Sequence, residues 1–249
     1  MKLGRLMIAG ALWLAGTTMA AHAQSPEETR AALPGLVRDA FDTPYGKALV
    51  AELGKSLRNN ADPACLSAKG IAPDQLEPRG RDLIINWGLR MMETTNSFID
   101  SKAYNEKFAA SAGRGAAAEL ARLRNDANVK RGLELQQPIR LAKIADSIFE
   151  QFDRYVLITK IKLATVSPLG TGNNELLEMN PTEAAEEQLD KYIAANKSPA
   201  LKKYLALSEK SLAVSTAATK IEDAWKVGPH TFFGGVETEL AELCIVSKR

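Results

Sequence analysis

Histidine and cysteine are scarce in this sequence, with two of each among 249 residues. His22 lies in an N-terminal segment that we expect to be removed, so His230 is the one histidine of the predicted mature chain. A single histidine does not supply a multi-histidine catalytic centre. Once both cysteines are paired, it does not supply a Cys/His zinc site either. The sequence therefore predicts neither a bound metal nor a cofactor.

Common catalytic and nucleotide-binding motifs are also missing. The sequence has no GxSxG nucleophile motif, no GxxxxGK[ST] phosphate loop and no GxGxxG motif after a strand. These absences argue against the usual serine hydrolases and nucleotide-binding enzymes. We assign no catalytic residues, although an enzyme that uses carboxylates, with or without His230, stays an open alternative.

Strand patterns, membrane spans and an excess of one charge are absent as well. No segment alternates strictly between apolar and polar residues, and no apolar run beyond residue 23 is long enough to cross a membrane. The 32 basic residues nearly balance the 30 acidic ones, which argues against a nucleic-acid partner. The densest basic stretch, residues 122–143, is interpreted as a solvated helix face and loop.

The N-terminal segment has the pattern of a secretory signal peptide. Two positive charges precede an apolar core at residues 6–20, and a small-x-small cleavage motif follows at residues 21–23. We therefore expect cleavage between Ala23 and Gln24, and a soluble mature protein in a bacterial periplasm.

The two cysteines fit an exported protein. An oxidising compartment favours a disulfide between Cys65 and Cys244, and two separate buried thiols are the alternative. Cys244 adjoins the apolar positions Leu240 and Leu243, so we expect it to face the core.

What the sequence has in abundance is helical periodicity. Residues 79–101 predict one helix, and residues 138–165 predict a longer one that begins at Pro138. The apolar stripe of the longer helix comprises Leu141, Ile144, Ile148, Phe152, Tyr155, Thr159 and Leu163. The predicted fold is all-α, with a bundle-like single domain over residues 24–249 and a possible subdivision near residues 167–180, which are rich in Gly, Asn and Pro.

Two stretches read alike: TPYGKALVAELGKSL from Thr43 and SPALKKYLALSEKSL from Ser198. Ser or Thr is a favourable N-cap and Pro fits the first helical turn, so each phrase predicts a helix start. The buried side is predicted to comprise Leu49, Leu53 and Leu57 in the first phrase, and Leu201, Leu205 and Leu212 in the second. Capping and packing account for most of the match, and an internal duplication is the alternative.

Residues 189–213 and 38–57, which contain these phrases, resemble a family of secreted bacterial all-helical domains of unknown function. In that family a helix that ends in an aromatic residue precedes a Ser-Pro-x-x-Lys helix start. The resemblance covers about 25 residues near each end of the chain. The family has no agreed activity, so the resemblance implies an all-helical exported domain and no catalytic residue.

The strongest candidate for a binding segment is WKVGPHTFFGG, residues 225–235. Trp225, Phe232 and Phe233 predict a loop that grips an apolar or ring-bearing ligand, with His230 as its polar contact. The alternative is a turn whose aromatic side chains fill the core. Other clusters have plainer interpretations. Solvated helix faces are predicted for Glu183, Glu186, Glu187 and Asp190, and for Asp146, Glu150 and Asp153; Trp87, Met91, Met92 and Tyr155 fit a core or a cavity.

Taken together, the sequence favours an exported, non-enzymatic helical protein that binds a partner protein, a small apolar ligand or envelope material. The alternative is a periplasmic hydrolase or lyase that depends on carboxylates or on His230. An assembly role through helix-on-helix contacts is a third possibility.

Overall fold

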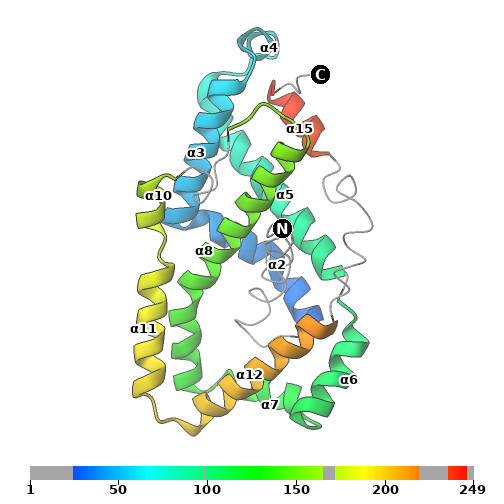
Figure 1. Ribbon diagram of the computed structural model, residues 1–249, viewed down its shortest axis with the longest axis vertical. Coiled ribbons are helices and arrows are strands. Elements are labelled where there is room, and N and C mark those ends of the chain that lie inside the picture. The colour runs from blue at the N-terminus through cyan, green and yellow to red at the C-terminus, as the bar shows by residue number, and fades with distance from the viewer. Residues whose placement is uncertain (1–24, 98, 165–171, 219–234, 246–249) are drawn as a thin grey trace, which may run out of the picture. The chain divides into compact units, whose positions relative to one another are not determined.

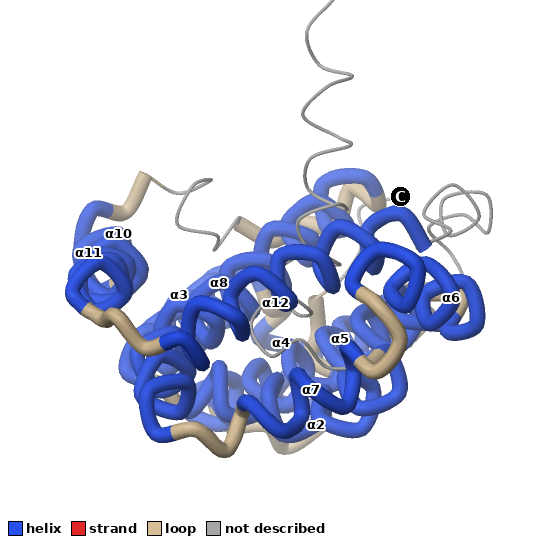
Figure 2. The backbone as a smooth tube through the Cα atoms, turned by 90° about the horizontal axis from the view of Figure 1, so that it is seen from below, coloured by secondary structure: helices blue, strands red, loops and turns tan. Residues whose placement is uncertain are grey.

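The computed structural model describes residues 25–97, 99–164, 172–218 and 235–245, and every regular element in these ranges is a helix (Figures 1 and 2). This confirms the predicted all-α fold. The predicted signal peptide, residues 1–23, lies outside the described residues.

The chain divides into two compact units. Unit 1 comprises residues 1–33, 92–144 and 181–226, and unit 2 comprises residues 34–91, 145–180 and 227–249. Three of the divisions between them fall within helices, namely α2 (Pro26–Asp42), α5 (Leu76–Ser97) and α8 (Ala127–Ile158). The predicted single domain with a subdivision near residues 167–180 stays a prediction.

Unit 1 is built around α12 (Pro199–Ala218), which packs on α6 (Ser101–Ala112) and α7 (Ala116–Leu123) (Figure 1). Among the described residues of this unit, α11 (Thr182–Ala195) is the remaining complete helix. A hydrophobic core cluster of unit 1 contains Tyr104, Phe108, Leu120, Leu123, Val129, Leu201, Tyr204, Leu207 and Val214. Burial of these apolar side chains is the main favourable contribution to the folding of the unit.

Unit 2 contains α3 (Pro44–Asn60), α4 (Pro63–Ala68), α10 (Asn174–Met179), α15 (Val236–Glu242) and the short 3-10 helix η1 (Pro73–Gln75). Two aromatic pairs pack edge to face in its core. The ring centroids of Trp87 and Phe152 are 5.6 Å apart, and those of Phe41 and Phe149 are 5.7 Å apart. Since Trp87 is fully buried in such a pair, the core interpretation applies to this residue.

The two similar phrases both begin helices, as the sequence predicts. Thr43 Oγ1 accepts a hydrogen bond from the Gly46 N–H at 2.9 Å, and α3 starts at Pro44. Ser198 Oγ accepts from the Leu201 N–H at 3.3 Å, and α12 starts at Pro199. Leu49, Leu53, Leu57 and Leu201 are buried, whereas Leu205 and Leu212 are half-buried. The prediction about packing is therefore correct for the first phrase and partly correct for the second.

The predicted bounds of the longest helix are wrong at both ends. Pro138 does not begin α8 but lies exposed inside it, and α8 ends at Ile158, before Thr159 and Leu163. The helix extends upstream of the proline because its earlier turns also pack. Val129 is fully buried, and a Cβ added at Gly132 would contact Leu201 at 3.5 Å. Tertiary packing thus outweighs the lost backbone hydrogen bond.

The disulfide between Cys65 and Cys244 is present, with the two Cα atoms 5.7 Å apart. Cys244 is buried, as its position beside the leucine stripe of α15 predicts. The Asp62 N–H donates to the Cys244 carbonyl at 3.0 Å, and the Lys69 ammonium donates to the carbonyls of Ala241 and Glu242. These bonds fix the end of α15 beside α4.

Candidate functional sites

The aromatic segment predicted from the sequence lies outside the described residues. Trp225, His230, Phe232 and Phe233 all fall in the range 219–234. Their role as a ligand-binding loop therefore stays a prediction.

The acidic residues of α11 form a solvated face, as the sequence predicts. Glu183, Glu186, Glu187 and Asp190 are exposed. Glu186 pairs with Lys143 at 2.7 Å and Glu187 pairs with Lys191 at 2.6 Å. Within the described ranges, no group of three or more His, Cys, Asp or Glu side chains is arranged to hold a metal ion.

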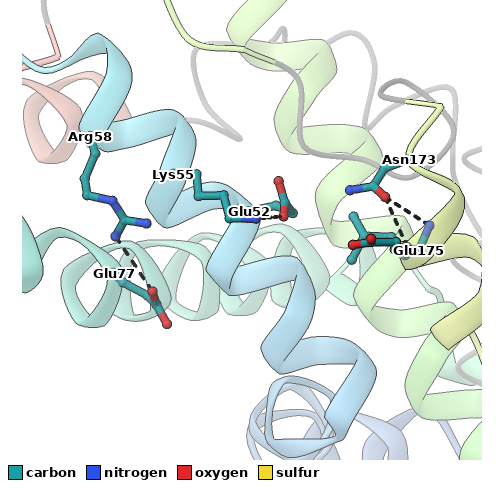
Figure 3. A network of polar contacts seen from close by, with 7 residues as sticks. Glu52, Lys55, Arg58, Glu77, Asn173 and Glu175 are labelled. Carbon is teal, nitrogen blue, oxygen red and sulfur yellow. Dashed lines mark hydrogen bonds and ion pairs between the residues drawn. The ribbon is translucent and has the colours of Figure 1, made fainter.

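A second surface network lies on α3 in unit 2 (Figure 3). Lys55 pairs with Glu52 on the same helix at 2.5 Å, and Arg58 reaches Glu77 of α5 at 3.8 Å. Nearby, the Asn173 side chain caps α10 by accepting from the Glu175 N–H at 3.1 Å. Solvent-exposed ion pairs of this kind contribute about 0–1 kcal/mol each, so we assign this face no ligand.

Asp146 of α8 forms the first cluster that departs from the sequence interpretation. Its carboxylate accepts hydrogen bonds from the Tyr45 hydroxyl of α3 and from the Asn180 amide, the latter at 3.0 Å. Asp146 is therefore not the solvated, ion-paired side chain that the i,i+4 spacing suggests. Asn180 lies two residues before Thr182, where α11 begins, and the Pro181 N-cap position has no side-chain capping bond.

Burial shifts the proton affinities of this cluster. It raises the pKa of Asp146, although the hydrogen bonds from Tyr45 and Asn180 act in the opposite direction. One turn along α8, burial raises the pKa of Glu150, and the charges of Asp146 and Asp153 raise it further. Burial and the bond to Asp146 also raise the pKa of the Tyr45 phenol. Carboxylic acids with raised pKa values are suited to hold and deliver a proton.

Arg140, which lies on α8 but in unit 1, is the second charged residue whose environment differs from the sequence interpretation. It belongs to the basic stretch that the sequence assigns to solvent, yet only 4% of the residue is exposed. Burial lowers the pKa of its guanidinium to about 10, and the neighbouring Tyr204 phenol of α12 acts in the opposite direction. The interpretation of residues 122–143 as a solvated face is therefore wrong at Arg140.

Hydroxyl groups follow Tyr204 along one face of α12. Ser208 and Ser211 lie four and seven residues further on, which places them on the same side of the helix. Ser211 forms a 2.9 Å hydrogen bond with Tyr104 of α6. By contrast, the buried oxygen atoms of Tyr204 and Ser208 have no hydrogen-bond partner among the described residues. We refer to the buried residues Arg140 and Tyr204 and the half-buried Ser208 as the polar strip of unit 1.

The sequence contains a weak signal for each buried cluster. Arg140 lies four residues before Ile144, which places it next to the apolar stripe of α8. Asp146 lies three residues before Phe149, a fully buried residue. Helical spacing predicts that Arg140 and Asp146 lie near the apolar stripe of α8. It does not predict that other helices cover these two residues.

Comparison with protein-family models, curated proteins and solved structures finds no match. The resemblance to secreted helical domains is therefore still a prediction. None of the helices in the described ranges is long and apolar enough to cross a membrane.

Proposed function

We propose that this chain is an exported, non-enzymatic helical protein that binds a small polar molecule in the interior of unit 1. The proposal keeps the function class favoured by the sequence and moves the binding site from the aromatic segment to the Arg140–Tyr204–Ser208 strip. A small apolar ligand at residues 225–235 remains a prediction of the sequence, as does binding of a partner protein or of envelope material.

Two features support export. The first 23 residues have the charge and apolar pattern of a cleaved signal, and Cys65 and Cys244 form a disulfide. Structural disulfides are typical of proteins in oxidising compartments such as the periplasm. Together these features favour a periplasmic location.

The single observation that carries the binding proposal is the unpartnered hydroxyl of Tyr204. Buried polar atoms are nearly always hydrogen-bonded, because leaving one unsatisfied costs about 1–3 kcal/mol. Only 4% of Tyr204 is exposed, its hydroxyl has no partner among the described residues, and it lies next to the buried guanidinium of Arg140. A bound polar molecule would satisfy that hydroxyl and the nearby Ser208 hydroxyl together.

Native mass spectrometry of the full-length protein, expressed with its signal and purified gently from the periplasm, tests this proposal. We expect a mass excess that disappears on denaturation. Tyr204→Phe should reduce the excess, because it removes the hydroxyl and keeps the ring. Tyr104→Phe is the matched control, since the hydroxyl of that buried tyrosine is already bonded to Ser211. An apo protein in every preparation would contradict the proposal.

A second function, a carboxylate-dependent hydrolase or lyase, is favoured by one observation: Asp146 and Glu150 combine half-burial with raised pKa values. It predicts that Asp146→Asn abolishes hydrolysis of nitrophenyl ester or glycoside substrates, while Asp153→Asn on the same helix preserves it. If hydrolysis depends on His230→Ala instead, the aromatic segment is the site. No hydrolysis by the wild-type protein would remove this candidate for those substrate classes.

A further inference from the structure

The C-terminal end of α8, in unit 2, presents apolar and basic side chains to solvent together. Leu157 is 78% exposed and Ile158 is 56% exposed, and the exposed Lys160 and Lys162 follow them closely in the chain. We propose that these four residues, which we call the α8 tip, bind the surface of an anionic phospholipid bilayer. The contact is peripheral and reversible, and it is independent of the ligand site proposed inside unit 1.

Backbone hydrogen bonds hold the α8 tip in a fixed shape. The Ile161 N–H donates to the Val156 carbonyl at 3.1 Å, and the Lys160 N–H donates to the Leu157 carbonyl at 3.3 Å. With the positive φ of Lys160, 55°, these bonds form a Schellman motif, in which glycine is the usual residue at the position of this lysine. Val156 and Ile161 are both buried, so the motif attaches the tip to the core while Leu157 and Ile158 remain exposed.

The α8 tip combines two features that folding alone does not favour. A lysine at positive φ is less stable there than glycine, because its Cβ crowds the backbone. Leu157 and Ile158 also forgo the favourable free energy that burial of their side chains would contribute. A bilayer surface suits both features, because its acyl region accepts aliphatic side chains and its anionic headgroups attract lysine.

The charge of the tip selects an anionic partner. Residues 154–164 contain no acidic side chain. Within the described ranges, neither Lys160 nor Lys162 forms an ion pair. Glu237 of α15 lies beside Tyr155, just before the tip, and its single negative charge opposes only part of theirs. Unpaired lysines beside exposed aliphatic side chains are typical of segments that bind anionic membranes.

Unit 2 also contains an exposed apolar pair without this charge pattern. Leu177 and Met179 of α10 are both exposed, and the exposed Glu178 lies between them. An anionic bilayer would repel that carboxylate. The pair on α10 therefore provides a comparison in which apolar exposure is present but the complementary charge is not.

Sedimentation with sucrose-loaded vesicles tests this inference. The protein is expressed with its signal and purified from the periplasm, and its mass verifies removal of residues 1–23, because an uncleaved signal would itself bind lipid. We expect binding to vesicles of equal parts phosphatidylglycerol and phosphatidylcholine. Binding to phosphatidylcholine alone should be about tenfold weaker, since only the apolar part of the contact remains. Added salt should weaken binding to the anionic vesicles, because it screens the lysine charges.

Variants locate the contact. Leu157→Gln and Ile158→Gln should each weaken binding about tenfold, because each loses apolar surface that the bilayer buries. Lys160→Gly should weaken binding about fivefold through the lost charge. It should also preserve or raise thermal stability, since glycine favours the positive φ at this position, so weaker binding would not result from poor folding. Leu177→Gln is the matched control and should leave the affinity unchanged.

Several results would overturn the inference. These are no sedimentation with anionic vesicles, equal affinity for neutral and anionic vesicles, an unchanged affinity in Leu157→Gln, or a loss of binding in Leu177→Gln as large as that in Leu157→Gln. Analytical ultracentrifugation of the wild type and Leu157→Gln tests a second copy of the chain as the occupant. If the wild type binds no vesicles and forms a dimer that Leu157→Gln dissociates, the tip is an interface between copies and the lipid assignment is wrong.

Discussion

At the scale of single residues, burial changes the role of charged side chains that the sequence assigns to solvent. Arg140 and Asp146 lie on the same helix, six residues apart, and each is covered in its own unit. Burial lowers the pKa of the first and raises that of the second, because it disfavours the charged form of either group. Burial of these two groups therefore makes the free energy of unfolding depend on pH.

Asp146→Asn provides the pH test. The folded-state pKa of Asp146 is raised above its ordinary value of 3.8, so the folded protein holds the proton more tightly than the unfolded chain does. The resulting stabilisation is fully present below about pH 3.8 and is lost as pH rises through the folded pKa. We expect the unfolding free energy of the wild type, minus that of the variant, to decrease as pH rises through this window.

Urea unfolding between pH 3 and 7 measures that difference. Glu150 acts in the same direction, because the charge of Asp146 contributes to its raised pKa. If the difference instead increases with pH, the hydrogen bonds from Tyr45 and Asn180 stabilise the Asp146 carboxylate by more than burial destabilises it.

At the scale of elements, the two similar phrases share a way of starting a helix but differ in what they pack against. Gly46 lies three residues after the Thr43 cap, and Leu201 lies three residues after the Ser198 cap. A Cβ on Gly46 would lie 2.1 Å from the Ala40 carbonyl oxygen and 2.7 Å from the Phe41 Cα. The start of α3 thus needs glycine because the backbone at the end of α2 lies against it.

Two glycine-to-alanine substitutions in helices should therefore change stability in opposite directions. Helix propensity alone predicts that Gly→Ala stabilises a helix interior by about 1 kcal/mol. Gly35→Ala in α2 should follow this rule, because no atom lies within 4 Å of the added Cβ. Gly46→Ala should instead destabilise the protein by about 1–3 kcal/mol, since backbone atoms must move. Thermal and urea unfolding of both variants measure the direction of each change in stability. Equal effects of the two substitutions would contradict the close approach of the α2 backbone to Gly46.

At the scale of the whole molecule, the Cys65–Cys244 disulfide joins residues 179 positions apart in the sequence. A cross-link across such a long segment restricts the unfolded chain strongly. Both cysteines belong to unit 2, but the enclosed segment includes residues of both units. We therefore expect removal of the disulfide to affect the stability of both units.

Reduction, or the paired substitutions Cys65→Ala and Cys244→Ala, should lower the free energy of unfolding by about 2–5 kcal/mol. Urea unfolding with and without a phosphine reductant measures this loss, and the reductant should have no effect on the cysteine-free variant. The non-reduced wild type should also have a mass two hydrogens below that of the reduced chain. Unchanged stability after verified reduction would contradict the expected role of the cross-link.

Some features of this protein followed from local sequence. Helix periodicity gave the all-α class, and the Thr43-Pro44 and Ser198-Pro199 pairs gave two helix starts, because capping involves atoms only a few residues apart. Two cysteines permit a single intramolecular pairing, and the structure contains it. The bounds of α8 were harder to predict, because packing of its first turns compensates for an interior proline.

Tertiary structure decided which polar groups are buried. A helical pattern places Arg140 beside Ile144 and Asp146 near Phe149, but it does not say which helices cover them. Tyr204 is 64 residues from Arg140, and Tyr45 is 101 residues from Asp146. Burial and proton affinity depend on these distant neighbours. The helices were therefore determined largely by the sequence itself, while the candidate sites arose only when the fold brought separate helices together.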